Sequence, residues 1–365
     1  MRFRVADYEI MLRERTENSR IVNIGVPLFT VLGSIVFAAF ILETIGVSSL
    51  AALGTIVTQL TTIRQINEVV VRMIPLLLAG FAVYLPMRAG LWNIGASASI
   101  FGGGIAATAI GLYVPLPRIL LIPAIILGAG LVGAALLFIS GYLRARWEIN
   151  EILTSLLLAL TMIELNEYAI LLMPADQVVH SSASLPAAAT FPRIPGTRIH
   201  LGLALAALAF VGVYLLMNKT RFGYEIKTFG SNPEAAFQAG ISKPKVVIGT
   251  FVLGGFLAGM AGAGEVAGIH NRLVPEFSPG FGFTAIAIAL IGQRGEFRVL
   301  GAAFLFAVVY IAGANIELVH NVPFAIVEVF EAIVILFFIA GEAIRRFRID
   351  VINVDSVGEQ VVANQ

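Results

Sequence analysis

Residues 118–142 read RILLIPAIILGAGLVGAALLFISGY, an apolar run with no charged residue after its first position. An α-helix needs about 20 apolar residues to cross the roughly 30 Å hydrocarbon core of a bilayer. A helix satisfies its own backbone hydrogen bonds in lipid, whereas the strands of a membrane barrel alternate apolar and polar residues. Because this run does not alternate, it predicts a transmembrane helix.

The rest of the chain repeats this pattern. Its 365 residues are 58% hydrophobic and 13% charged, with a mean hydropathy of +0.90. A soluble domain usually carries about 25% charged residues, so this composition excludes an ordinary solvated surface. We therefore predict an all-α, polytopic membrane protein with about ten spans. The eighth is too short to cross alone, so it is either a half-helix or a span that includes flanking residues. The expected spans are residues 21–42, 69–85, 91–113, 118–142, 151–173, 199–217, 246–264, 281–292, 299–317 and 322–341.

The positive charges predict the orientation of the chain. Lysine and arginine accumulate on the cytoplasmic side of membrane proteins. With the N-terminus inside, 18 of the 24 lysine and arginine residues are cytoplasmic, and an inverted chain reverses this ratio. We expect a cytoplasmic segment at 1–20, a transmembrane domain at 21–345 and a cytoplasmic tail at 346–365, in the cell membrane. The positive residues left outside are Arg64, Arg72, Arg118, Arg193, Arg198 and Arg272.

Composition and motifs exclude several classes of function. The net charge of +1 gives no support to a nucleic-acid surface. There is no cysteine, and the four histidines lie far apart without metal-ligand spacing. No GxxxxGK[ST] loop occurs, so the chain lacks a phosphate cradle of its own. We expect no metal, no cofactor and no enzymatic activity.

The longest predicted cytoplasmic loop, residues 218–245, reads NKTRFGYEIKTFGSNPEAAFQAGISKPK. Its SNPE sequence at 231–234 is a helix start, with a Ser or Asn cap, a proline in the first turn and Glu234 in a capping position. Gly240 suits a left-handed helix stop. We expect a helix of about two turns at 231–240 on the inner membrane surface. The alternative is a solvated connector.

At this loop the chain resembles a known family. Glu234-Ala235-Ala236 followed by Gly240 is similar to the EAA-x-x-x-G signature of ABC importer permeases. The resemblance covers about residues 70 to 345 and is closest to permeases for ribose-type sugars, nucleosides and branched-chain amino acids. The other matching stretches are WNIG at 92–95, NEI at 150–152, RFG at 221–223, GSNPEAA at 230–236, GFGF at 280–283, AIA at 285–287 and LIG at 290–292.

The resemblance implies a permease architecture of the ribose- and vitamin B12-importer kind and the import of a small polar solute, most closely a nucleoside or simple sugar. It implies three protein partners: a separate ABC ATPase, a second permease chain that is identical or a sister, and an extracytoplasmic substrate-binding lipoprotein. The short cytoplasmic helix would dock in a groove of the ATPase. Its coupling residues would be Ser231, Pro233, Glu234, Ala235, Ala236 and Gly240.

The chain also departs from the pattern of this family. Ser97 and Ser99 stand where the family usually has a glutamate and a glutamine, Thr284 where an aspartate is common, and Ala159 where a polar residue is usual. This loss of polar groups indicates an unusual substrate or the less polar half of a heterodimer.

Polar and aromatic residues within the predicted spans are candidates for the solute pathway, because ionisable groups in a membrane are costly and often functional. Each has a competing structural reading: solvation at the interface, an ion pair, helix packing or lipid contact. The candidates are Asn93, Ser97, Ser99, Glu164, Phe281, Phe283, Thr284 and Glu331. For Gly255 and Gly259, which have GxxxG spacing, we expect close helix packing instead.

Two rival functions remain open from the residues. An ion-coupled secondary transporter could use the intramembrane glutamates, but the short cytoplasmic helix has no purpose in it. An intramembrane enzyme would need a metal cluster or a nucleophile–base pair at depth, and the sequence shows neither.

Overall fold

The computed structural model describes residues 2–5, 8–14, 61–175, 180–320 and 347–353, with scattered positions of 32–57 and 329–341. The chain divides into two compact units. Met1–Leu50 and Ala332–Gln365 form the terminal unit, and Ala51–Glu331 form the helical unit. The first and tenth predicted spans, and Glu331, lie wholly or largely outside the described residues.

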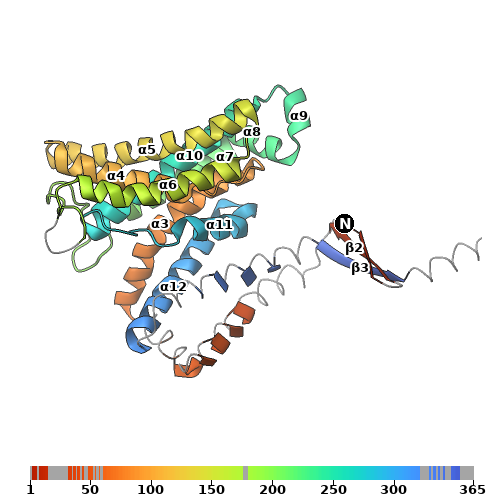
Figure 1. Cartoon of the computed structure of the whole chain (residues 1–365), viewed down its shortest axis with the longest axis horizontal. Coiled ribbons are helices and arrows are strands. Elements are labelled where there is room, and N and C mark those ends of the chain that lie inside the picture. The colour runs from red at the N-terminus through yellow and green to blue at the C-terminus, as the bar shows by residue number, and fades with distance from the viewer. Residues whose placement is uncertain are drawn as a thin grey trace, which may run out of the picture. The chain divides into compact units, whose positions relative to one another are not determined.

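The helical unit contains seven helices long and apolar enough to cross a membrane, counted over the described residues (Figure 1). Each coincides with a predicted span, so the prediction of an all-helical, polytopic membrane domain is confirmed, whereas the number ten stays a prediction. The seven are α3 (Ile63–Arg88), α4 (Ala96–Tyr113), α5 (Arg118–Trp147), α6 (Glu151–Leu172), α7 (Gly202–Lys219), α10 (Lys243–Ala263, continued by the π-helix η1, Gly264–His270) and α12 (Glu296–His320).

The eighth predicted span is a half-helix. Helix α11 (Phe281–Ile291) has 11 residues, and the short 3₁₀ helix η2 (Gly292–Arg294) follows it. Eleven residues give about 16 Å of helix, roughly half of a hydrocarbon core. The half-helix starts after Gly280, whose φ is +69°, and packs against the start of α4: a Cβ built on Gly282 would lie 1.9 Å from the Ser97 hydroxyl.

Glycine contacts hold the centre of the helical unit together. A Cβ on Gly255 would lie 2.3 Å from the Gly133 carbonyl oxygen, and one on Gly259 would lie 2.2 Å from the Ala129 carbonyl oxygen. Backbone-to-backbone approach of this kind needs residues without side chains. The predicted packing role of the two glycines is therefore confirmed, and it joins α10 to α5.

Burial separates central helices from peripheral ones. The apolar window of α3 is 83% buried, whereas those of α6 and α7 are each 28% buried. Figure 1 shows α11 and α12 beside α3 on one side of the unit and α4, α5 and α6 on the other. Because α6 and α7 expose most of their apolar surface, lipid or another protein chain must cover it.

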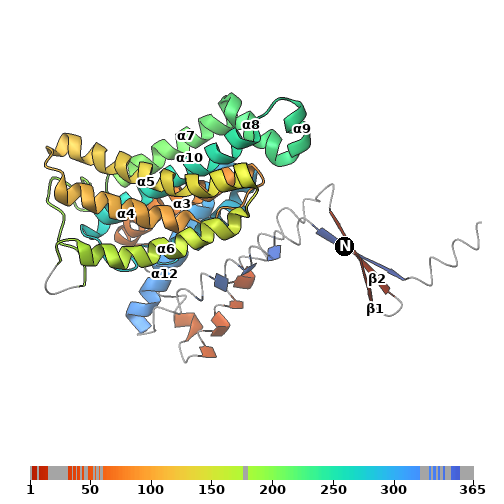
Figure 2. The ribbon, with the colours of Figure 1, turned by 45° about the horizontal axis from the view of Figure 1, so that its top comes forward.

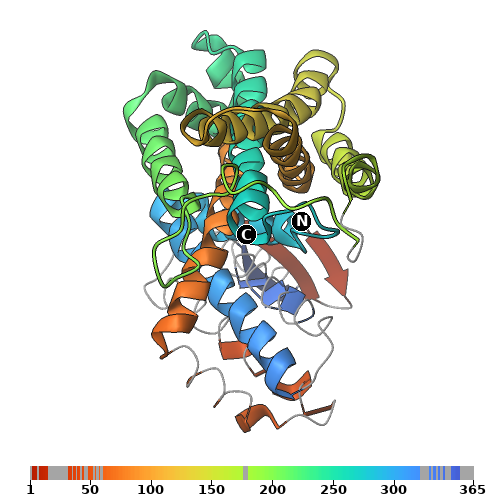
Figure 3. The same ribbon diagram turned by 90° about the vertical axis from the view of Figure 1, so that its left-hand side faces the viewer.

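An irregular segment, described at residues 173–175 and 180–201, lies at the end of the bundle opposite the short helices α8 (Arg221–Ser231) and α9 (Pro233–Gln238) (Figure 2). Figure 3, which looks onto this end, shows the segment crossing over the ends of the helices. It is tied to η1, since Phe191 N–H donates to the Ala267 carbonyl (2.8 Å) and Arg193 Nη2 donates to the Gly268 carbonyl (2.7 Å). The described residues of this segment thus cap this end of the bundle.

His200, just before α7, is buried under this cap with 3% exposure. Its Nδ1 accepts from Gly202 N–H at 3.0 Å, and burial lowers the pKa of its imidazole to about 4. Since the ordinary pKa is about 6.5, the unfolded chain binds the proton first, and stability falls as pH drops from 6.5 to 4. Lowering the pH from 7.5 to 5 should therefore reduce the free energy of unfolding by about 2 kcal/mol through this residue.

Thermal unfolding of the detergent-purified protein checks this at the two pH values. We expect His200→Gln to reduce the difference between them. If both proteins respond to pH equally, the buried neutral imidazole is the wrong account.

The terminal unit contains a three-stranded antiparallel sheet that the sequence analysis did not predict. Its order is β1 (Arg2–Val5), β2 (Tyr8–Glu14), β3 (Phe347–Asn353). The register pairs Tyr8 with Asn353 and Glu14 with Phe347. The predicted N-terminal segment and C-terminal tail therefore join each other through backbone hydrogen bonds.

Candidate coupling surface and solute pathway

The loop at 218–245 folds into two helices, although the sequence indicated only one. Helix α8 is capped by Thr220, whose hydroxyl accepts from Gly223 N–H at 3.1 Å. Its first turn fits only glycine at 223, since a Cβ there would lie 2.1 Å from the Leu216 carbonyl oxygen. This short helix turns the chain directly back from the end of α7.

Helix α8 is fixed to the bundle by a buried carboxylate. Glu225 is 4% exposed and accepts from Lys245 Nζ at 2.8 Å and from Arg221 Nε at 3.1 Å. The hydrogen bond from Lys245 holds the pKa of Glu225 below its usual value, against the opposing effect of desolvation. At its other end Gly230 touches α3, where a Cβ would lie 2.1 Å from the Arg88 carbonyl oxygen. The helix thus contacts both α10 and α3.

Helix α9 is the short helix that the sequence predicts, with slightly different limits. Asn232 is its cap, accepting from Ala235 N–H at 3.0 Å, while Ser231 is the last residue of α8. Pro233 occupies the first turn, and Gly240 has a φ of +75° just after the helix. The predicted N-terminal cap, the proline in the first turn and the left-handed glycine after the helix are therefore confirmed.

One face of α9 packs and the other is open to solvent. Ala236 is buried, whereas Glu234 and Gln238 are exposed and the Phe237 side chain is 78% exposed. A groove runs along this face, lined by Phe229, Pro233, Glu234, Phe237, Gln238, Ile241 and Lys243. An exposed aromatic ring beside a groove and a carboxylate is typical of a protein-docking surface. We call this set of residues the α9 surface.

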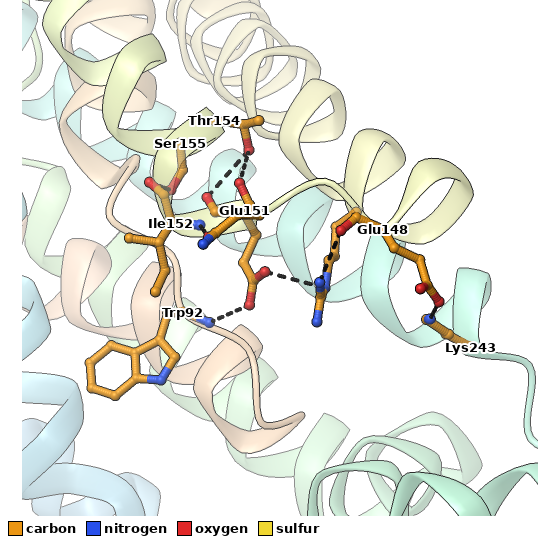
Figure 4. Close-up of polar contacts among 9 residues, drawn as sticks. Trp92, Glu148, Glu151, Ile152, Thr154, Ser155 and Lys243 are labelled. Carbon is orange, nitrogen blue, oxygen red and sulfur yellow. Dashed lines mark hydrogen bonds and ion pairs between the residues drawn. The ribbon is translucent and has the colours of Figure 1, made fainter.

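A polar network connects the α9 surface to the transmembrane helices (Figure 4). Lys243, at the start of α10, donates to Glu148 at 2.5 Å, and Glu148 ends α5 in a left-handed conformation. Arg144 on α5 pairs with Glu151 on α6 at 3.2 Å, and Glu151 also accepts from Trp92 N–H at 3.4 Å. The α9 surface is therefore linked to α5 through Lys243 and Glu148, and from α5 through Arg144 and Glu151 to α6 and the loop before α4.

The two glutamates of this network offer a matched pair of variants. Glu151 is buried, and hydrogen bonds to charged groups are worth about 1.5–3 kcal/mol. We expect Glu151→Gln to destabilise the protein by about 1.5 kcal/mol, measured by thermal unfolding in detergent. Glu148→Gln should change it much less, because that pair is solvent-exposed. Equal effects would mean that the Arg144–Glu151 contact does not hold the helix ends together.

Most of the candidate pathway residues are buried within the helical unit. Asn93 donates to the Ala82 carbonyl (3.1 Å) and accepts from Gly95 N–H (2.9 Å), so both ends of its amide hold the loop before α4. Ser99 donates to the Gly133 carbonyl at 2.9 Å, and Thr284 donates to the Gly280 carbonyl at 3.1 Å. Their role in the pathway stays a prediction, to be tested in other conformations. The buried candidates are Asn93, Ser97, Ser99, Phe281 and Thr284.

The remaining described candidates face outward. Phe283 is 53% exposed, and Glu164 lies on the exposed side of α6, whereas Glu331 lies outside the described residues. The Ser97–Gly282 contact brings the start of α4 beside the start of α11, two segments that carry candidate residues. Sequence reasoning missed Glu225 and the Arg144–Glu151 pair, although the quoted NEI stretch contains Glu151.

The fold and the α9 surface define a class: a multi-span helical membrane protein with a short, exposed helix at one end and no nucleotide-binding loop in its sequence. Comparison with known proteins narrows this class. Residues 65–341 match the family described as the permease component of the branched-chain amino acid transport system, and the chain belongs to this family.

Three relatives match along most of the chain. The glucose ABC transporter permease protein TsgB13 of Haloferax volcanii is 40% identical over 341 residues, covering 90% of each chain. The guanosine permease NupP of Bacillus subtilis is 29% identical, covering 89% of this chain and 96% of its own. The nucleoside permease NupB of Lactococcus lactis is 30% identical, covering 88% and 92% respectively. This chain is thus a membrane permease subunit of an ABC importer, a transport subunit and not an enzyme, and the family implies an ATPase and a substrate-binding partner.

Proposed function

We propose that this permease imports a sugar, with a nucleoside as the second candidate, using ATP hydrolysed by a separate subunit docked on the α9 surface. The observation that carries the coupling role is the capped helix α9, which leaves Phe237 exposed and is tied through Lys243 to the transmembrane helices. The relative named for glucose is 40% identical, and those named for guanosine and nucleosides are 29% and 30% identical. A sugar is therefore the first solute to test for uptake.

Two observations support cytoplasmic N- and C-termini. Strands β2 and β3 hydrogen-bond to each other, and two paired segments must lie on the same side of a membrane. An even number of spans between them, such as ten, satisfies this requirement. The excess of lysine and arginine in the segments assigned inside supports the cytoplasmic side for both ends and for the α9 surface.

A second permease chain, identical or a sister, would cover the exposed face of α6. Glu164 lies on that face, about two turns from the end of the helix at Leu172. A carboxylate facing lipid at this depth is costly, so a protein neighbour or an aqueous pathway between two chains is the favoured surrounding. Ser97 and Ser99, in place of the family's usual acidic and amide groups, fit the less polar half of a heterodimer.

Reconstitution tests this function. Proteoliposomes holding this chain, its ATPase, a second permease and a lipoprotein binder should accumulate labelled D-glucose or guanosine only when ATP is present on the side of the membrane that carries the ATPase. The rival secondary transporter predicts uptake by the purified chain alone, abolished by an uncoupler and indifferent to ATP. That result would overturn the proposal.

A further inference from the structure

Arg72 on α3 carries a charge that no acidic group neutralises within the described part of the chain. It lies nine residues into the helix, ~13 Å along the axis from Ile63. Glu68, one turn earlier, would be its natural partner, but Arg198 takes that carboxylate at 2.9 Å. Arg72 is half-buried, so part of the residue stays exposed at the surface of the helical unit.

Two aromatic rings hold the guanidinium in place. Its central carbon lies 4.0 Å from the ring centroid of Tyr310 on α12 and 5.0 Å from that of Phe281 on α11. The two rings meet edge to face, with centroids 6.0 Å apart. A ring face is a weak hydrogen-bond acceptor, and the guanidinium carries five N–H donors, so two ring contacts leave donors for an oxygen acceptor.

Polar groups continue outward from Arg72 along the same helices. Gln65 lies two turns before Arg72, on the same face of α3, and its amide faces Asn315 of α12 at 3.4–3.5 Å. A cation with donors that find no acceptor is costly within a membrane, and such groups usually face water or a solute. The three residues therefore mark a polar track between α3 and α12.

We propose that Arg72 contacts the transported solute, donating paired N–H bonds to two neighbouring oxygen atoms of a sugar ring. Gln65 and Asn315 line the approach to it. A planar fork of donors matches vicinal hydroxyls, and its positive charge excludes cationic solutes. This inference rests on the proposed function and names the chemistry that its substrate must present.

The charge of the track can be tested without knowing the substrate. The chain has no cysteine, so Gln65→Cys supplies a single thiol. We expect an anionic, membrane-impermeant thiosulfonate to react with it faster than a cationic one. Adding Arg72→Gln should lower the ratio of the anionic to the cationic reaction rate by at least about fourfold, because it removes one charge that lies ~10 Å from the thiol in an aqueous path. Leu131→Cys, on the exposed apolar face of α5, should react with neither reagent.

Uptake by the assembled transporter tests the ligand chemistry. Wild type should discriminate at least tenfold between D-glucose and one of its monodeoxy analogues, or between guanosine and its 2′- or 3′-deoxy form. Arg72→Lys keeps the charge but loses the fork, so it should remove this discrimination while the ATPase still co-purifies.

Three results would overturn the proposal: a Gln65→Cys thiol that reacts with neither reagent, a rate ratio unchanged by Arg72→Gln, or discrimination retained in Arg72→Lys. If wild type takes up neither solute, the proposed substrate class fails, and the reaction rates of the Gln65→Cys variant still decide whether Arg72 faces an aqueous path.

Discussion

Gly259→Val is expected to prevent the helical unit from assembling. A Cβ at this position would lie 2.2 Å from the Ala129 carbonyl oxygen and 3.1 Å from the Cα of Gly130, both on α5. Both obstacles are backbone atoms, so side-chain rotation cannot relieve them. Overpacking of a rigid core commonly costs 1–3 kcal/mol, and we expect at least about 3 kcal/mol here.

The measurement is the yield of monodisperse protein in detergent and its melting temperature. Gly212→Val is the matched control, because it places the same side chain within α7, where nothing lies within 4 Å of the new Cβ. The control should be recovered at near wild-type yield. Equal recovery of both variants would mean that α5 and α10 do not meet through glycine.

Gly240→Pro is expected to uncouple the permease from its ATPase while leaving the bundle folded. Gly240 has a φ of +75°, whereas proline fixes φ near −65°. The substitution also removes the N–H that donates to the Phe237 carbonyl at 3.0 Å. The end of α9 must therefore rearrange, and the exposed Phe237 moves with it. We expect uptake to fall at least about tenfold, the equivalent of 1.4 kcal/mol in coupling.

Gly196→Pro controls for backbone strain as such. Gly196 has a φ of +76° with nothing within 4 Å of its Cβ, but it lies in the irregular segment at the opposite end of the bundle. This variant should still co-purify with the ATPase. Loss of ATPase binding in both variants would point to general misfolding, and loss in neither would remove the coupling role of α9.

The long helices could be predicted because their signal is local. A run of about 20 apolar residues predicts a membrane span without any information about distant contacts. The cap and stop of α9 are local as well, since Asn232 and Gly240 act within their own turn. Helix α8 is different, because Gly223 and Gly230 look like helix breakers in sequence. It exists because Glu225, Ile226 and Phe229 are buried against neighbouring helices, and that gain depends on tertiary packing.

Other features depend on contacts that are distant in sequence. Strand β2 finds its partner β3 more than 300 residues later, and no local pattern specifies that pairing. The Asn93 amide bonds to backbone groups, and since residue type does not distinguish this use from a place in the pathway, its pathway role stays a prediction. Arg72 was counted with the external charges because it lies only three residues inside the predicted span 69–85. Helix α3 in fact starts at Ile63, which places Arg72 well within it.

The most direct test of the central claim is the accessibility of a single thiol at Phe237→Cys in a chain that has no other cysteine. An impermeant maleimide should label it in inside-out vesicles stripped of the ATPase, and should not label it in intact cells. Adding the ATPase back should protect it. Labelling from outside intact cells, or no protection by the ATPase, would contradict the assignment of the α9 surface as the cytoplasmic site through which a separate motor drives this permease.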